Sequence, residues 1–190
     1  SKKHRVILVS TDPTSGRGGI ANTVRSFILA FSDIGCEVRS VVSHNSKSYT
    51  GKWLPFCLTL FIILQEVISA RVQRHKLTVW MHVGGPVSLI RKFLIGSFSR
   101  SLGVEVIIHL HSASTELFLD GSWKEIFFNV MLSPAHKVVV VSNWWRNRLI
   151  ALATHKTIYV CSNFIEAFTD SARTVELKKA TQPDSSVIKI

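Results

Sequence analysis

The chain has 190 residues, of which 46% are hydrophobic and 18% are charged, a composition that excludes an intrinsically disordered chain and allows one sizeable core. The formal net charge of +11, from 23 lysines and arginines against 12 acidic residues, suits either an anionic partner or a plain solvated surface. The cysteines, Cys36, Cys57 and Cys161, are odd in number and far apart, which favours reduced thiols in a cytoplasmic protein without a structural metal.

The first half of the chain alternates short β-branched runs with longer amphipathic patterns. Strands are predicted over residues 5–10, 37–43 and 78–83, and helices over residues 20–31, 54–73 and 86–102. Gly16, Gly18 and Gly19 stand between the first strand and the first helix. The segment Leu54–Ala70 is strongly apolar, but its uninterrupted stretch is shorter than the ~20 residues of a membrane span. A buried helix is therefore expected there.

The second half continues the alternation, with strands predicted over residues 104–110, 137–142 and 157–160. Ser142 is a suitable N-cap for a helix over residues 143–151. Charge-poor strands joined by helices predict a doubly wound α/β fold, with a mostly parallel, Rossmann-like sheet and helices on both faces.

The composition changes after Phe168. We therefore expect one Rossmann-like domain over residues 1–168 and a linker or connecting helix over residues 169–186. The final residues 187–190, "VIKI", have the pattern of a strand that begins a second domain.

The glycine-rich stretch lies where such a sheet binds its ligands, beyond the carboxyl end of a strand and at a helix start. Backbone N–H groups at that place suit phosphate. However, "SGRGGIA" is not the dinucleotide fingerprint G-x-G-x-x-G, the second strand has no acidic residue at its end, and the P-loop lysine is missing. A tight turn and a phosphate contact both remain open.

Two histidines leave the fourth predicted strand in "HLHSAS". Alternation places His109 and His111 on one side of the sheet, with His111 nearer the strand's exit. Such a pair can bind metal, but the sequence offers no third ligand at a suitable spacing, so no metal site is expected. We expect His109 to be a packed strand residue and His111 to contact a ligand. His82 and His136, at strand edges, form no pattern.

Four segments, taken in order, carry a family resemblance over about residues 4–168: "GRGGIANTVRSFILAFSDIGCEV", "GVEVIIHLHSAS", "AHKVVVVSNWWRNRL" and "IYVCSNFIE". Together they resemble the N-terminal domain of the family 4 retaining glycosyltransferases, which have two facing Rossmann-like domains. The chain departs from the family in "SNFIE", where Phe164 takes the place of the usual glycine. The family's second domain, with its E-x7-E motif, is not in this sequence.

The resemblance implies that Gly18 and Gly19 approach the pyrophosphate of a nucleotide-sugar donor and that His111 is the catalytic residue at the donor sugar. Further donor or acceptor contacts are expected from four residues: Arg17, Ser112, Ser142 and Asn163. The nucleotide-sugar is a substrate, so neither a cofactor nor a metal is expected. The implied function is sugar transfer to a glycan or lipid-linked acceptor in the synthesis of cell-surface polysaccharide or lipopolysaccharide. Acceptor choice is expected to depend on the loops 45–53 and 115–123, and the chain by itself is expected to be inactive.

Two other function classes stay open: a Rossmann-type dinucleotide-binding oxidoreductase domain, and a basic module that binds anionic surfaces. Nucleic acid is not an expected partner, because "WWRNR" is the only stretch that interleaves aromatic and basic residues. The net charge and the apolar helix together suggest a cytoplasmic protein that is peripheral on the inner face of a membrane. The surface charges expected to contribute are Arg71, Arg74, Lys76, Arg91 and Lys92.

Overall fold

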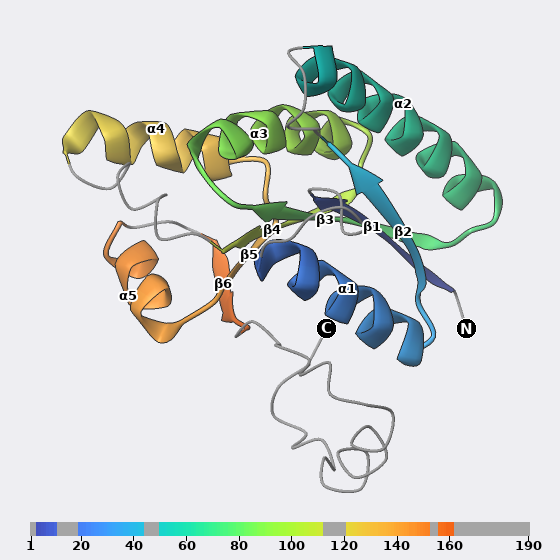
Figure 1. Ribbon diagram of the computed structural model, residues 1–190, viewed down its shortest axis with the longest axis horizontal. Coiled ribbons are helices and arrows are strands. Elements are labelled where there is room, and N and C mark those ends of the chain that lie inside the picture. Colours follow the sequence, from blue (N-terminus) through green and yellow to red (C-terminus); the bar gives the residue numbers. More distant parts are fainter. Residues whose placement is uncertain (1–2, 11–18, 44–49, 112–120, 153–155, 162–190) are drawn as a thin grey trace, which may run out of the picture.

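A computed structural model describes residues 3–10, 19–43, 50–111, 121–152 and 156–161. These residues contain one six-stranded parallel sheet with the strand order β2-β1-β3-β4-β5-β6 (Figure 1). Its strands are β1 (His4–Ser10), β2 (Glu37–Val42), β3 (Lys76–Val83), β4 (Glu105–Leu110), β5 (Lys137–Val140) and β6 (Thr157–Val160). The predicted doubly wound α/β fold is confirmed. The expected domain boundaries fall within residues 162–190, which lie outside the described residues, so they stay predictions.

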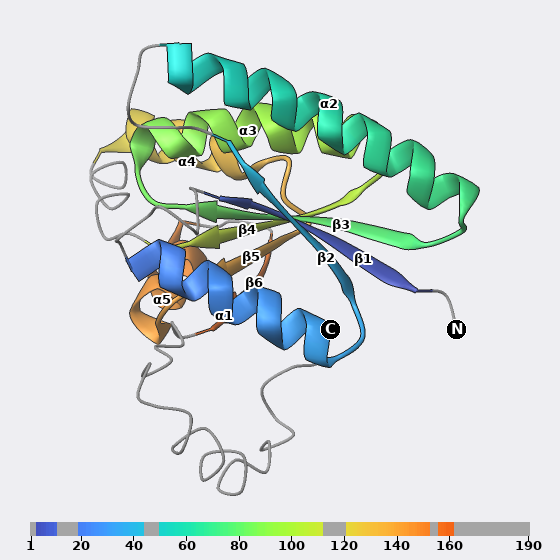
Figure 2. The same cartoon turned by 45° about the vertical axis from the view of Figure 1, so that its right-hand side comes forward.

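Five helices connect the strands in the described part of the chain: α1 (Gly19–Asp33), α2 (Thr50–Val72), α3 (Pro86–Ser101), α4 (Ser122–Leu132) and α5 (Asn143–Ala151). Helix α1 connects β1 to β2, which lies at one end of the strand order. The other helices connect strands in the opposite direction across the sheet, from β2 to β3 and then in turn to β6. Because parallel crossovers are right-handed, α1 covers one face of the sheet and α2, α3, α4 and α5 cover the other. Figure 2 shows α1 and α2 on opposite sides of the strands.

The two faces of the sheet bury different kinds of side chain. On the face of α2 to α5, strand residues such as Val79, Met81 and Ile108 pack with helix residues such as Ile63 and Phe128 in one large apolar core. The face of α1 has a smaller core, in which Val6 and Leu8 of β1 pack on Phe27 and Phe31. Trp80, His82 and His109 lie beside Phe27 on this second face. The α1 face is therefore the aromatic and polar one.

Charged side chains pair at the amino ends of the strands. Arg5 reaches Glu37 on β2 and Glu66 on α2, in both cases at 2.8 Å, and Arg39 also pairs with Glu66. At the start of β4 and β5, Lys137 Nζ lies 2.8 Å from a carboxylate oxygen of Glu105. These contacts link neighbouring strands and fasten α2 to the sheet.

Helix α2 differs from the buried helix expected at residues 54–70. One side is buried through Phe56, Ile63 and Val67, but the outer side exposes a row of large apolar residues, here called the outer stripe: Leu54, Leu58, Phe61, Ile68 and Val72. In the described residues, Trp53–Val72 is the one helical segment that is long and apolar enough to cross a membrane by length and composition, and 33% of it is buried. Core helices of soluble proteins pass the same test.

Two predicted loops are partly helical. Helix α2 begins at Thr50, inside the loop expected over residues 45–53. Helix α4 was not predicted at all, and its first turn takes in Trp123, the last residue of the loop expected over residues 115–123. The remainder of these two loops, residues 45–49 and 115–120, lies outside the described residues.

Candidate functional site

The carboxyl ends of all six parallel strands lie along the same side of the sheet, here called the carboxyl edge. Three of the predicted site residues are described there. Gly19 is the first residue of α1, the helix that follows β1. His111 comes directly after β4, and its backbone N–H donates to the carbonyl of Val83 at 3.0 Å. Ser142 is the N-cap of α5, where its Oγ accepts a hydrogen bond from the backbone N–H of Trp145 at 3.4 Å. Arg17, Gly18, Ser112 and Asn163 lie outside the described residues.

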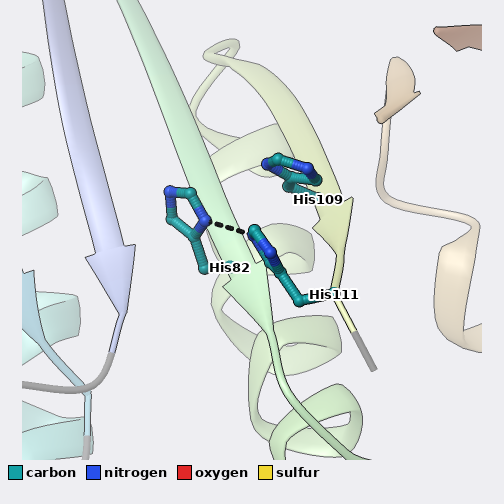
Figure 3. A group of neighbouring side chains, drawn as sticks. All are labelled: His82, His109 and His111. Carbon is teal, nitrogen blue, oxygen red and sulfur yellow. Dashed lines mark hydrogen bonds between the residues drawn. The ribbon is translucent and has the colours of Figure 1, made fainter. Parts of the chain in front are cut away.

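Three histidines converge at this edge, on the α1 face. His82 of β3 and His109 of β4 are direct partners in the parallel register, and His111 follows two residues later (Figure 3). Nδ1 of His82 and Nε2 of His111 lie 2.7 Å apart, and the ring centroids of His109 and His111 are 3.9 Å apart. One ring nitrogen from each histidine can be chosen so that all three lie within 4.8 Å of one another.

The two inner histidines are buried and incompletely hydrogen-bonded. His82 is 2% exposed and His109 is 0% exposed. Among the described residues, Nε2 of His82 and both ring nitrogens of His109 find no hydrogen-bond partner. The ring of Phe27 packs edge-on against both histidines, with centroids 5.4 Å away in each case. A buried polar atom without a partner costs about 1–3 kcal/mol, so the cluster reduces the stability of the fold unless something binds to it.

Burial also holds these histidines in the neutral form. Desolvation lowers the pKa of His82 well below its usual value, and the neighbouring His109 and His111 lower it further. Desolvation likewise lowers the pKa of His109, with a further contribution from His111, while the backbone of Cys161 acts in the opposite direction. Neutral imidazole nitrogens carry a free lone pair, which is the form that ligates metals and accepts protons.

A second buried basic group, Lys92 of α3, lies at the ends of β1 and β2. Its side chain is 1% exposed, and Nζ donates to Oγ of Ser43, directly after β2, at 2.5 Å. Ser43 in turn donates to the backbone carbonyl of Ser10 at the end of β1. Burial lowers the pKa of Lys92 to about 7, with a smaller contribution from Arg91. The expectation that Lys92 is a surface charge is therefore wrong.

The sequence identified only part of this site. It predicted that His109 and His111 share a side of the sheet with His111 nearer the exit, as the structure has them. It gave His82 no role and found no third ligand, because the pairing of β3 with β4 cannot be read from either strand alone. The burial of Lys92 could have been predicted from its spacing. Lys92 lies three residues from both Leu89 and Ile95, which places it on the buried side of α3.

No protein-family model matches the sequence, and none of the curated proteins matches it. The resemblance to glycosyltransferases therefore rests on the four ordered motifs, and the function stays a prediction.

Proposed function

We propose that this chain is the N-terminal, acceptor-side domain of a retaining glycosyltransferase that uses a nucleotide-sugar donor and a glycan or lipid-linked acceptor. The observation that carries the proposal is the shared carboxyl edge of the sheet, where α1 begins at Gly19, the last glycine of the glycine-rich stretch, and His111 leaves β4. In open parallel sheets, ligands bind in the crevice beyond this edge.

The start of α1 at this edge supports an anionic ligand. None of the described acidic side chains forms an ion pair with Lys92, His82 or His109. The first turn of α1 adds backbone N–H groups and the positive end of the helix dipole, both of which favour phosphate oxygens. A nucleotide-sugar carries its negative charge on the diphosphate, so this edge suits that half of the donor.

The proposed roles are those that the family resemblance implies. Gly18 and Gly19 bring backbone N–H groups to the diphosphate, where they stabilise the negative charge that develops on the leaving group. His111 lies at the donor sugar, and Arg17, Ser112 and Asn163 supply further donor or acceptor contacts. Ser142 caps α5 through a lone pair, so its hydroxyl hydrogen remains available for donation to a ligand. Sugar transfer itself uses no cofactor in this proposal.

The test is made on the full-length enzyme that the encoding gene specifies, because the second domain is needed for activity. His111→Ala is expected to lower turnover by at least about tenfold, since loss of a transition-state contact commonly costs about 10²–10³-fold. Gly19→Val is expected to block donor use, because a branched side chain then occupies the approach to the backbone. His75→Ala is the control, because His75 lies directly before β3, at the opposite edge of the sheet. Full transfer activity in both site variants would reject the proposal, as would a gene without a second Rossmann-like domain.

We also propose that the domain is cytoplasmic and binds the inner face of a membrane through α2. The outer stripe gives α2 an exposed apolar side, and Arg71 and Arg74 at its end are exposed. Basic residues near an anionic bilayer contribute about 1 kcal/mol each within a Debye length of the surface. Partial insertion of an amphipathic helix, together with such charges, gives reversible binding.

Co-sedimentation with vesicles of acidic lipid tests this placement. The wild-type chain is expected to bind at low salt, and the double variant Leu58→Ser with Phe61→Ser is expected to bind at least about tenfold more weakly, because each buried large apolar side chain contributes about 1.5–3 kcal/mol. Leu29→Ser is the matched control, since Leu29 is equally exposed but lies on α1, on the opposite face. No binding at low salt, or an equal loss in the control, would contradict the proposal.

A further inference from the structure

We propose that His82, His109 and His111 form a binding site for a divalent transition-metal ion, with Zn²⁺ as the best match. The three imidazoles come from two neighbouring strands and converge on one point of the α1 face (Figure 3). This inference goes beyond the proposed function and does not depend on it, because binding is a property of the described domain.

The spacing of the ring nitrogens fits such an ion. Zn–N bonds of about 2.0–2.1 Å in a tetrahedral arrangement place the ligand nitrogens about 3.3 Å apart. The nitrogens of His82 and His111 lie 2.7 Å apart, and no pair in the chosen set is farther apart than 4.8 Å. The 2.7 Å contact is shorter than the separation that zinc requires, so the rings must rotate to bind an ion. The backbone that carries them is ordered, since His82 and His109 lie in paired strands and the backbone N–H of His111 donates to Val83.

The donor set selects the class of ion. All three ligands are imidazoles, which suit zinc, copper, nickel and iron, whereas magnesium and calcium prefer oxygen ligands. Three protein ligands leave one position of a tetrahedral zinc ion for water or a substrate oxygen. His111 is only partly buried while His82 and His109 are buried, so this fourth position faces the His111 side, at the carboxyl edge of the sheet.

A metal ion accounts for more of the cluster than the alternatives do. A shared proton between His82 and His111 explains their short contact but leaves both nitrogens of His109 without a partner. Aromatic packing explains the contacts of His109 with Phe27 and Trp80, but phenylalanine or leucine would make these contacts without burying polar atoms. An ion gives one nitrogen of each histidine a strong partner and uses the apolar wall as the shell that excludes water.

The experiment uses the 190-residue chain without a histidine tag, treated with a chelator and then dialysed. Zn²⁺ is titrated by calorimetry and Co²⁺ by visible absorption, on a Cys57→Ser background because Cys57 is an exposed thiol. We expect one ion per chain, a melting temperature that rises with Zn²⁺, and the ligand-field bands of a tetrahedral cobalt centre with nitrogen ligands.

Variants locate the site. His82→Gln, His109→Gln and His111→Gln are each expected to weaken Zn²⁺ binding by more than the about 10–100-fold that loss of an outer-shell partner costs. His75→Gln, outside the cluster, is expected to keep wild-type affinity. His111 lies after the strand and is only partly buried, so His111→Gln is the variant expected to keep the native fold, which circular dichroism of the metal-free chain verifies.

Three outcomes would overturn the proposal: no Zn²⁺ binding by the wild-type chain, wild-type affinity in a folded His111→Gln chain, or a cobalt spectrum with thiolate charge-transfer bands. None of these readouts involves sugar transfer. Failure of the metal site and failure of the proposed glycosyltransferase activity are therefore distinguished.

Discussion

At the amino ends of the strands, acidic and basic side chains pair, whereas at the carboxyl ends Lys92, His82 and His109 are buried without an acidic partner among the described residues. The first arrangement stabilises the fold, because each buried charge finds an opposite charge. The second reduces stability, because polar groups lose water without full compensation. Proteins keep such local costs mainly where they bind something, so the difference points to the carboxyl edge as the working end of the sheet.

The largest effect is expected at the amino ends, from Glu66→Gln. Glu66 is paired with both Arg5 and Arg39, and the side chains of Arg5 and Glu66 are only 13% and 12% exposed. Removing the carboxylate leaves Arg5 with Glu37 as its one acidic partner among the described residues, and breaking a largely buried pair costs about 3 kcal/mol. Urea unfolding measures the loss. The exposed Asp33→Asn should stay within about 0.5 kcal/mol of wild type. Equal stability of the two variants would remove the contrast between the two ends.

A stabilising effect of about 2 kcal/mol at pH 7 is expected from Lys92→Met at the carboxyl end. Methionine keeps the length of the side chain and removes a buried amine that has no acidic partner among the described residues, and a buried polar group without full compensation costs about 1–3 kcal/mol. A loss of stability in this variant would show that the lysine supports the fold and would weaken the comparison.

The pH dependence of stability gives a second measurement of Lys92. Its pKa is about 7 in the folded chain, below the ordinary value of 10.5, so between these values the unfolded chain binds the extra proton. Stability should therefore rise with pH from about 7 to 10.5, by up to about 1.4 kcal/mol per pH unit, and should be insensitive to this group below pH 7. Lys92→Met should lack that rise.

Replacing histidine by leucine is expected to change the free energy of unfolding by a smaller amount, with opposite sign at the amino and carboxyl ends of the strands. In metal-free protein, His109→Leu should stabilise by about 1 kcal/mol, because it removes two buried nitrogens that have no partner. His4→Leu should destabilise by a similar amount, because Nε2 of His4 is 2.8 Å from the hydroxyl of Thr78. Thermal unfolding with and without Zn²⁺ measures both. Destabilisation by His109→Leu in the absence of metal would contradict the cost assigned to this cluster.

Local pattern was enough to predict the sheet and most of its helices. The runs at residues 5–10 and 104–110 are apolar and β-branched, and the glycines Gly35 and Gly103, both with positive φ, end the helices before β2 and β4. Helix α4 was missed because its residues are apolar on nearly every side, so no helical period is visible. Ser122 and Glu125 in "SWKE" have the spacing of a capping box, and this start signal was overlooked.

The candidate site was harder to predict, because it depends on contacts between distant segments. The histidine triad needs β3 beside β4 in a register that pairs His82 with His109, and neither strand's sequence specifies its neighbour. The burial of Lys92 likewise depends on the packing of α3 over Ser43, which is 49 residues away in sequence. The outer stripe is exposed because the other side of α2 packs on the sheet. The segment is apolar on almost every side, so its sequence alone does not show which side packs on the sheet.

The position of β1 between β2 and β3 has a consequence for how the sheet folds during synthesis. Of the six described strands β1 is made first, yet it pairs with β3, whose last residue is Val83. At about 5–20 residues per second, a ribosome takes about 4–15 s to add the residues between Ser10 and Val83. Throughout that interval Ile7, Leu8 and Val9, all buried in the finished sheet, have at most β2 as a strand partner. The nascent chain is therefore a natural client for chaperones that shield apolar segments until β3 emerges.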